Sequence, residues 1–311
     1  MPVVDLQHGC LRAQLSTAGG LVLGLWWEDE GVAVPLLRPA PSSDADALSS
    51  ACYPLVPFGN RVRDNRFRFE GRDHVLEPNT DWDRHYLHGE GWQAGWRITA
   101  QDPAGLAMVF SHTGGGTPYV YEAEQRFALA GGAFEMQLSV TNRGSAPLPY
   151  GLGWHPYFPL TPATTLMART TALWTEVEEW LPGEPIAIPE ELDFSAPRSI
   201  PDRWINNGLQ DWDGLAVITW PERNMQLRFE ADPVFRHAFL FVSTTEFDPS
   251  FRRNYFCFEP MSHLANGHNL PDLGDLTILK PGETLAGSVR FRPQHLSGRP
   301  LQGGDHLRQS A

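Results

Sequence analysis

Residues 119–141 read YVYEAEQRFALAGGAFEMQLSVT, and this stretch decides the fold class. Large apolar residues alternate with polar ones on both sides of Gly131-Gly132. A period of two sends successive side chains to opposite faces of a strand, and a glycine pair is typical of the turn between two strands. The stretch therefore predicts an antiparallel hairpin with one buried face.

Similar patterns recur along the rest of the chain. Alternation appears in three further stretches, at residues 66–70, 225–230 and 285–291. A second group is more continuously apolar, at residues 215–220, 238–243 and 255–258. The first pattern is typical of strands with one buried face and the second of central strands, and no segment shows a 3.6-residue period over more than two turns. We therefore predict an all-β protein.

The domain organisation follows from length and composition. Residues 38–51 and 181–203 are rich in proline and in serine or acidic residues, which predicts loops. A chain of 311 residues can form one undivided β-domain, and no repeat or linker divides this one. We predict a single β-sandwich domain over residues 1–292 and a polar C-terminal tail over residues 293–311.

Charge and cysteine content restrict the partners and the compartment. The net charge is −13, so neither nucleic acid nor an anionic membrane is an expected partner. Cys10, Cys52 and Cys257 are odd in number and lack CxxC spacing, which argues against a disulfide framework or a cysteine zinc site. No signal peptide and no run of about 18 apolar residues is visible. These features predict a cytoplasmic protein.

Four short segments combine unusual polar residues with aromatic ones: residues 53–61 (YPLVPFGNR), 86–89 (YLHG), 151–160 (GLGWHPYFPL) and 255–260 (YFCFEP). Pro156 holds His155 in an extended backbone among aromatic residues, where a histidine can act as a general acid or base. Glu259 ends an apolar strand, and burial there would raise its pKa and make it a stronger base. An exposed strand end is an equally compatible interpretation of Glu259 taken alone.

The other two segments suit the binding of hydroxyl groups. Arg61 follows Asn60 directly before a predicted strand, and its guanidinium can bind hydroxyls or a carboxylate. His88 lies close in sequence to Trp92 and Trp96, which suits a sugar cleft because apolar sugar faces stack on aromatic rings. Taken singly, such residues are more commonly a surface arginine and a structural histidine.

In this order and at this spacing, the four segments resemble the aldose 1-epimerase (galactose mutarotase) family. The resemblance extends from about Gly20 to Phe291. The family's Asn-Arg-Ile, Leu-His-Gly, His-Pro-Tyr-Phe and Glu-Pro motifs correspond to Asn60-Arg61-Val62, Leu87-His88-Gly89, His155-Pro156-Tyr157-Phe158 and Glu259-Pro260. The one difference within these motifs, valine for isoleucine, is conservative.

The resemblance implies a fold, an activity and a set of residue roles. The fold is a large antiparallel β-sandwich, called a supersandwich, which would make residues 1–292 a catalytic domain. The activity is exchange of the two anomers of a small-molecule aldose. Glu259 would be the general base that deprotonates the anomeric hydroxyl, and His155 the general acid that protonates the ring oxygen. Arg61, His88 and Asn60 would bind the substrate.

One position departs from the family pattern. The family has a sugar-binding aspartate before a Gly-Trp-Asp-Gly-like stretch, which is matched here by residues 211–214 (DWDG). Counting back places Asn206 at the aspartate position, and a shifted alignment offers Asp202 or Asp211. Asparagine keeps hydrogen-bonding capacity without charge, so the departure bears on sugar specificity more than on the chemistry.

The expected reaction needs one acid and one base. Proton transfers at the ring oxygen and the anomeric hydroxyl open the C1–O5 bond, rotation about C1–C2 presents the other carbonyl face, and reclosure reverses both transfers. No hydride, phosphate or radical moves, and the sequence contains neither GxGxxG nor GxxxxGK[ST]. We therefore predict no cofactor and no metal.

Other functions remain open at this point. A hexose-6-phosphate 1-epimerase could hold phosphate with Arg63, Arg66 and Arg68, although alternation places the last two on a solvent face. A non-catalytic sugar-binding or sensor protein would need the binding residues but not the acid–base pair. A glycosidase would need a second enclosed acid, which the aromatic segments lack.

A zinc site is a further alternative. His85, His88 and His155 could supply three ligands, but no HExxH spacing supports such a site.

Overall fold

Antiparallel strands form nearly all the regular structure of residues 2–296, the part of the chain that the computed structural model describes. Every helix within these residues is a short 3₁₀ turn. The predicted all-β class is confirmed, and two large sheets account for most of the strands.

The first large sheet has 11 strands and carries the middle of the molecule. Its order is β1 (Val3–His8), β2 (Leu11–Ser16), β3 (Leu21–Asp29), β5 (Cys52–Leu55), β15 (Gly153–Pro159), β24 (Tyr255–Met261), β23 (His237–Val242), β20 (Ile205–Gln210), β17 (Ala172–Glu176) and β18 (Pro182–Ile186), with β4 (Val32–Pro35) paired to β3. Two of the continuously apolar stretches are β23 and β24, which lie near its centre, as predicted for central strands.

The second large sheet has nine strands. Its order is β10 (Arg97–Asp102), β11 (Gly105–His112), β12 (Tyr121–Ala130), β13 (Ala133–Asn142), β26 (Thr284–His295), β22 (Met225–Ala231), β21 (Leu215–Trp220), β16 (Thr165–Ala168) and β19 (Arg198–Ser199). The predicted hairpin is β12 and β13, which pair from Ala130 opposite Ala133 to Tyr121 opposite Asn142.

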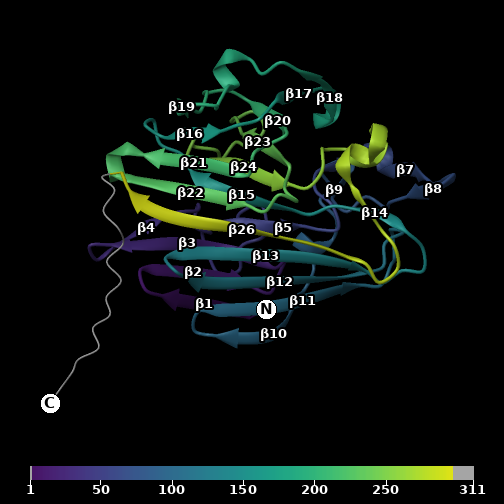
Figure 1. The fold of residues 1–311 in the computed structure, drawn as a ribbon, viewed down its shortest axis with the longest axis horizontal. Helices are drawn as coiled ribbons and strands as arrows, with labels where there is room; N and C mark the ends of the chain where they lie inside the picture. Colours follow the sequence, from purple (N-terminus) through teal and green to yellow (C-terminus); the bar gives the residue numbers. More distant parts are fainter. Residues whose placement is uncertain (1, 297–311) are drawn as a thin grey trace.

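Three two-stranded sheets complete the fold. They are β6 (Arg61–Val62) with β9 (Tyr86–Leu87), β7 (Arg66–Phe69) with β8 (Arg72–Val75), and β14 (Leu148–Tyr150) with β25 (Thr277–Leu279). Figure 1 shows β7, β8, β9 and β14 together at one end of the large sheets. These pieces bring loops from distant parts of the sequence to one end of the molecule.

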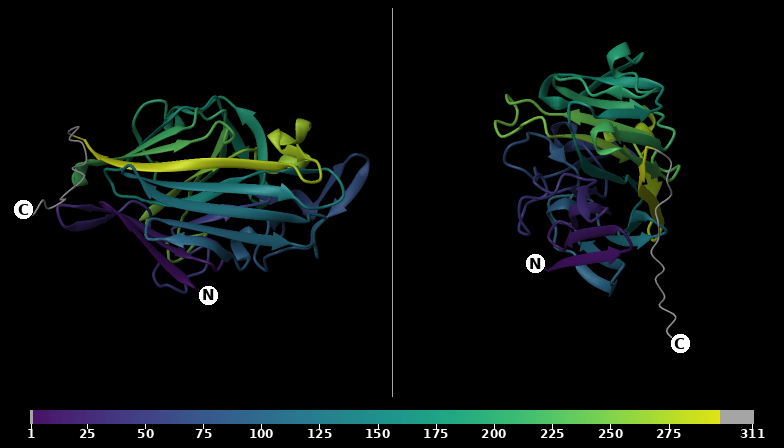
Figure 2. Two further views of the ribbon diagram at one scale, coloured as in Figure 1. Left: turned by 60° about the horizontal axis from the view of Figure 1, so that its bottom comes forward. Right: turned by 90° about the vertical axis from the view of Figure 1, so that its left-hand side faces the viewer.

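The two large sheets pack face to face, as Figures 1 and 2 show from three directions. Strand β15 shows how a period of two builds this sandwich. Trp154 packs against Phe127 of β12 with ring centroids 6.2 Å apart, and Phe158 packs against Phe229 of β22 at 5.6 Å. The alternate residue His155 points to the opposite, outer face of the 11-stranded sheet. All residues of β15 are nevertheless buried, because loops cover that outer face.

The predicted loops and tail need two corrections. Residues 36–51 contain no strand, as predicted. Residues 181–203, however, include β18 and β19, which pair on one side only at the ends of the two large sheets. Edge strands tolerate prolines because one row of N–H groups has no partner, so Pro182 and Pro185 do not prevent pairing.

The predicted tail begins too early. Strand β26 continues to His295, three residues past the predicted boundary at 292. Beyond Phe291 it pairs only with β22, so Pro293 occupies an unpaired edge and leaves the strand intact. Residues 297–311, the rest of the predicted tail, lie outside the described residues.

Two sequence expectations concern cysteines and membranes. Cys10, Cys52 and Cys257 are all free, and the last two are buried. Across residues 2–296, no helix is long and apolar enough to cross a membrane.

Candidate active site

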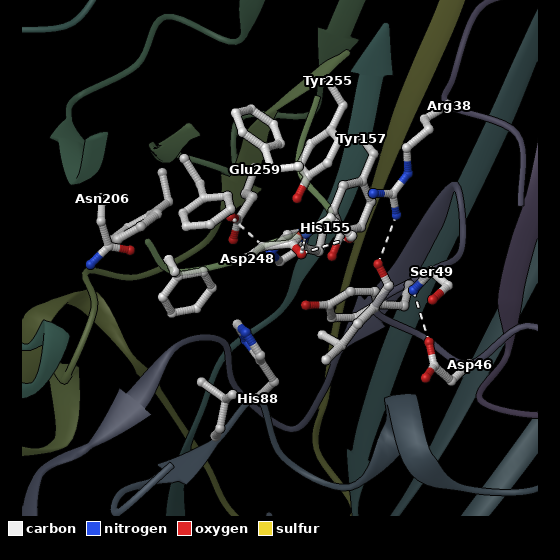
Figure 3. A pocket seen from close by; sticks show the side chains of 18 of the residues that line it. Arg38, Asp46, Ser49, His88, His155, Tyr157, Asn206, Asp248, Tyr255 and Glu259 are labelled. Carbon is white, nitrogen blue, oxygen red and sulfur yellow. Dashed lines mark hydrogen bonds and ion pairs between the residues drawn. The ribbon is translucent and has the colours of Figure 1, made fainter. Parts of the chain in front are cut away.

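A cleft of about 990 Å³ opens on the outer face of the 11-stranded sheet. It brings together all six residues predicted for the site: Asn60, Arg61, His88, His155, Asn206 and Glu259. Figure 3 shows His88, His155, Asn206 and Glu259 around the same space. His155 comes from β15, Asn206 from β20 and Glu259 from β24, and His88 follows β9, so widely separated parts of the chain meet here.

Strand register places Glu259 beside His155. β15 and β24 run antiparallel with Tyr157 opposite Cys257, two residues along each strand from this pair. Glu259 and His155 therefore lie opposite one another on one face, where cross-strand Cβ atoms are about 5 Å apart. Their side chains touch, with Nε2 of His155 3.1 Å from Oε1 of Glu259 (Figure 3).

Each member of this pair keeps one polar atom free for another partner. Oε2 of Glu259 and Nδ1 of His155 are buried and have no hydrogen-bond partner within residues 2–296. Most buried polar atoms in proteins are hydrogen-bonded, because an unsatisfied one costs about 1–3 kcal/mol. Two such atoms at the floor of a cleft indicate a site built to receive polar groups of a ligand.

Burial shifts the pKa values of the two groups in opposite directions. Loss of water raises the pKa of Glu259 well above its usual value, and the positive charge of Arg61 offsets only part of this effect. Loss of water also lowers the pKa of His155. Because the two groups touch, they titrate as one unit, and both shifts favour the form of the pair with no net charge. In that form Glu259 is protonated and His155 is neutral, and transfer of this one proton across the 3.1 Å contact gives a carboxylate and an imidazolium with the same net charge.

Aromatic rings fix the orientation of His155. Its ring stacks on Tyr53, the residue opposite it in β5, with centroids 4.5 Å apart and planes 18° apart. Tyr157, two residues along β15, covers a second side at 4.8 Å. The guanidinium of Arg38 lies 3.8 Å from the centre of the Tyr157 ring and 4.4 Å from that of Tyr255. The imidazole is thus held among rings at the cleft floor.

The sequence analysis did not identify these surrounding residues as part of the site. Side chains an even number of residues apart in a strand lie on the same face. Tyr157 follows His155 by two residues and Tyr255 precedes Glu259 by four, so this spacing could have identified both tyrosines. No local pattern pointed to Arg38, which lies in the predicted loop at 38–51 and donates hydrogen bonds to the carbonyls of Leu48 and Ser50.

Arg61 is held by a buried carboxylate that the sequence also left unnoticed. Its Nε and Nη2 both lie 2.8 Å from Oδ2 of Asp83, and both side chains are almost fully buried. Its guanidinium also lies 5.2 Å from the centre of the Trp180 ring. A planar guanidinium fixed in this way presents its remaining donor edge in one orientation.

His88 and Asn60 form a tight link beneath Arg61. Both have a left-handed backbone, with φ of 61° and 59°. Nδ1 of His88 accepts a hydrogen bond from the backbone N–H of Asn60 at 2.9 Å, and the His88 N–H donates to the Asn60 carbonyl at 3.0 Å. Burial lowers the pKa of His88 well below its usual value, so the ring is neutral and Nε2 carries the proton. His88 can therefore donate one hydrogen bond into the cleft.

Steric contact explains why the Leu-His-Gly segment needs a glycine at position 89. Gly89 has φ of +67°, and a Cβ atom there would lie 2.3 Å from the carbonyl oxygen of Val56. Only glycine fits this close approach in a left-handed conformation. The side-chain oxygen of Asn60 accepts the N–H of Arg61 at 2.8 Å, so Asn60 shapes the turn that presents Arg61.

Asn206 lies in the cleft, and the two aspartates of the shifted alignments do not. Asn206 stands on β20 opposite Phe241, is buried, and has no hydrogen-bond partner at Nδ2 among the described residues. Asp202 is exposed and pairs with Arg253, while Asp211 accepts a hydrogen bond from the Thr171 hydroxyl. The register of β20 thus selects Asn206 among the three candidates.

The arginines proposed for phosphate, and His85 of the zinc alternative, lie outside the cleft lining. Arg63, Arg66 and Arg68 do not line the cleft, and Arg68 pairs with Asp73 at an exposed position. His85 directs Nε2 toward Glu179 at 3.2 Å. Between residues 2 and 296 no three histidine, cysteine or acidic side chains are grouped to hold a metal ion.

Solved structures of other proteins share this fold. Strands with this arrangement also form the aldose epimerase homologue of C. elegans, with a TM-score of 0.80 at 14% identity over 95% of this chain and 99% of that one. A crystal structure from Escherichia coli K12, provisionally described as an aldose 1-epimerase, superimposes with a TM-score of 0.90 at 40% identity and covers 95% and 99% of the two chains. The fold is galactose mutarotase-like, as the resemblance implied.

Sequence comparison assigns the chain to a family within this fold. The model of the aldose 1-epimerase family matches residues 2–292. The uncharacterised protein YphB of Escherichia coli K12 is 41% identical over 297 residues, which cover 95% of this chain and all of YphB. The chain therefore belongs to the aldose 1-epimerase family.

Proposed function

We propose that this protein is an aldose 1-epimerase that interconverts the α and β anomers of a free hexose such as glucose or galactose. The observation that carries the proposal is the buried contact of 3.1 Å between His155 and Glu259 at the floor of a cleft with sugar-binding chemistry. Residues 1–292 would act as one catalytic domain. The free cysteines favour the cytoplasm as its compartment.

The spacing of the pair suits the two oxygens that react. The anomeric hydroxyl and the ring oxygen are bonded to the same carbon, so an acid and a base in contact can each reach one of them. With the proton of the pair on His155, the Glu259 carboxylate takes the proton of the anomeric hydroxyl through its free Oε2, while Nε2 of the His155 imidazolium protonates the ring oxygen and the C1–O5 bond opens. After rotation about C1–C2, the reverse transfers close the ring and restore the single proton of the pair.

Hydrogen-bond donors around the pair are available to hold the sugar. His88 offers Nε2–H and Asn206 offers its free amide Nδ2. Arg61, oriented by Asp83, offers the remaining edge of its guanidinium. Phe239, which lines the same cleft, offers an aromatic surface for the apolar face of a pyranose.

Charges in the cleft favour a neutral sugar over a 6-phosphate. The two cations that line it are already engaged, Arg61 by Asp83 and Arg38 by two backbone carbonyls and two tyrosine rings. The lining also includes Asp46, Glu246 and Asp248, which would repel a phosphate. We therefore rank hexose-6-phosphate below the free hexose as substrate, and no cofactor enters the reaction.

A panel of pure anomers tests the proposal. Freshly dissolved α-anomers of glucose, galactose and their 6-phosphates are followed by polarimetry or anomer-resolved NMR, with the spontaneous rate subtracted. We expect clear acceleration for the free hexoses. Acceleration of the 6-phosphates alone would indicate a phosphosugar epimerase, and binding without acceleration of any sugar would indicate a sensor.

A further inference from the structure

The tip of the β17–β18 hairpin, residues 177–181, reaches the candidate active site from one end of the 11-stranded sheet. Figure 1 shows the two strands side by side, and they pair from Leu173 opposite Ile186. Trp180 in this tip lines the cleft together with Arg61. The centre of its ring lies 5.2 Å from the guanidinium of Arg61, so the indole and this substrate-binding candidate are in contact.

Glu179 joins the hairpin tip to residues 83–85, which belong to a distant part of the chain. Its Oε1 lies 2.7 Å from Nη1 of Arg84, and its Oε2 lies 3.2 Å from Nε2 of His85. The His85 ring is buried, and its Nδ1 accepts the N–H of Asp64 at 3.1 Å. The proton of the neutral ring therefore lies on Nε2 and faces the carboxylate of Glu179.

Residues 83–85 also hold Arg61. Oδ2 of Asp83 lies 2.8 Å from two nitrogens of the Arg61 guanidinium, and Oδ1 of Asp83 accepts the N–H of His85 at 2.8 Å. Three consecutive residues thus fix both the arginine and the hairpin tip. The position of Trp180 relative to Arg61 is set by this shared support.

The backbone of the tip shows that the position of Trp180 needs such support. Glu179 and Trp180 both have φ of +61°, a left-handed conformation that is unfavourable for a bulky side chain. Conformations of this kind persist only where surrounding contacts hold them. Glu179 supplies its two contacts with residues 84 and 85, and the ring of Phe247 packs edge-on against Trp180 at 5.4 Å.

We infer that Trp180 is a substrate-binding residue that covers the sugar beside Arg61, and that Glu179 is the positioning residue that holds it there. A pyranose whose hydroxyls bond to the free edge of Arg61 brings its C–H groups against the indole. Trp180 exchanges no proton with the sugar, so it contributes to affinity and not to the chemical step. This inference rests on the proposed function for the identity of the ligand, but sugar binding can be measured without catalysis.

A binding test separates the role of Trp180 from the proposed activity. Calorimetry of the wild type, Trp180→Ala and Trp180→Phe uses glucose and galactose at anomeric equilibrium, where no net reaction contributes heat. We expect Trp180→Ala to weaken binding about tenfold, which corresponds to about 1.4 kcal/mol, and Trp180→Phe to retain most of the affinity. Near-UV circular dichroism checks that both variants fold.

The outcomes of the binding test are distinct. Weaker binding by Trp180→Ala supports the inference even if the wild type exchanges no anomers, in which case only the proposed function fails. Unchanged affinity in Trp180→Ala would overturn the inference while leaving anomer exchange intact.

A kinetic test addresses the positioning role of Glu179. Glu179→Gln removes the charge that pairs with Arg84, and Glu178→Gln is the matched control, because Glu178 is exposed in the same turn and forms no ion pair within residues 2–296. We expect Glu179→Gln to raise KM about threefold with kcat changed less than about twofold, since a lost binding contact acts on KM. Glu178→Gln should change neither constant.

Salt provides a readout that a merely structural role would not move. The hexose is uncharged and the Arg61–Asp83 pair is buried, whereas the side chains of Glu179 and Arg84 are 43% and 64% exposed. Raising NaCl from about 0.02 M to about 0.5 M screens exposed pairs, so KM of the wild type should rise about twofold while KM of Glu179→Gln stays constant. Equal salt dependence in the two proteins, or equal KM for Glu179→Gln and Glu178→Gln, would overturn the positioning role.

Discussion

Glu259 and Glu90 are both largely enclosed, yet their surroundings differ. Glu90 accepts hydrogen bonds from the hydroxyl of Tyr86 at Oε1 and from that of Tyr121 at Oε2, at 2.5 and 2.7 Å. Glu259 contacts His155 through Oε1, and its Oε2 has no partner among the described residues. The side chains are 15% and 2% exposed, so the more deeply buried carboxylate is the less satisfied one.

The difference separates a structural carboxylate from a chemical one. Two donors hold Glu90 in place and link β9 to β12, so its hydrogen bonds contribute to stability. The surroundings of Glu259 leave an acceptor unused and raise its pKa, which costs stability and suits the role of base that we propose for it. Substitutions at these two carboxylates and at His155 test the difference.

The largest effect is expected from Glu259→Gln. The amide cannot accept the proton of the anomeric hydroxyl, so the enzymatic rate of anomer exchange should fall by about 10²–10⁴-fold. Polarimetry measures the rate, and calorimetry should show that sugar binding persists. A variant that exchanges anomers at the wild-type rate would remove Glu259 as the base.

His155→Gln should come next. Glutamine keeps a polar group of similar reach but cannot deliver a proton, so we expect a loss of about 100-fold in the same assay. Near-UV circular dichroism serves as the control, because Tyr53 and Tyr157 stack on the imidazole. Undiminished exchange with intact folding would show that another group protonates the ring oxygen.

Glu90→Gln should affect stability rather than catalysis. Glutamine has one neutral acceptor oxygen, so one tyrosine hydroxyl loses its acceptor and the other loses a charged one. The expected decrease in the free energy of unfolding is about 1–2 kcal/mol by urea denaturation. The rate of anomer exchange should change by only a few-fold. If this variant lost as much activity as Glu259→Gln, the proposed division between the two carboxylates would be wrong.

The smallest effect is expected in the pH dependence of stability. The pKa of Glu259 is higher in the folded chain than its usual value of 4.5, so the folded state binds this proton more tightly than the unfolded state. The contribution of Glu259 to the free energy of unfolding is most favourable below about pH 4.5. It becomes less favourable as the pH rises from there to the pKa of Glu259 in the folded state.

Denaturation at pH 4 and pH 8 provides the comparison with Glu259→Gln. The variant should gain stability relative to the wild type on going from pH 4 to pH 8, because it lacks the buried carboxylate that ionises. His155 acts in the opposite direction, since its lowered pKa reduces stability as the pH falls below its usual value of 6.5. A pH-independent difference between the two proteins would contradict the raised pKa.

The all-β class could be predicted from local sequence, because a period of two along 119–141 can bury one face only as paired strands. It also identified His155 and Glu259, since each stands among apolar and aromatic residues and is followed by a proline. Their meeting follows from the register of β15 and β24, which no local pattern specifies.

The surroundings of that pair could not be predicted from local sequence. Asp83 beneath Arg61, the Arg38–Tyr157–Tyr255 stack and the contact of Trp180 with Arg61 each join segments far apart in the chain. The same holds for the contrast between Glu90 and Glu259, because the partners of a carboxylate are set by which strands and loops pack together. Local sequence fixes which face of a strand a side chain occupies, whereas its neighbours across the sheet and above it depend on strand order and loop paths.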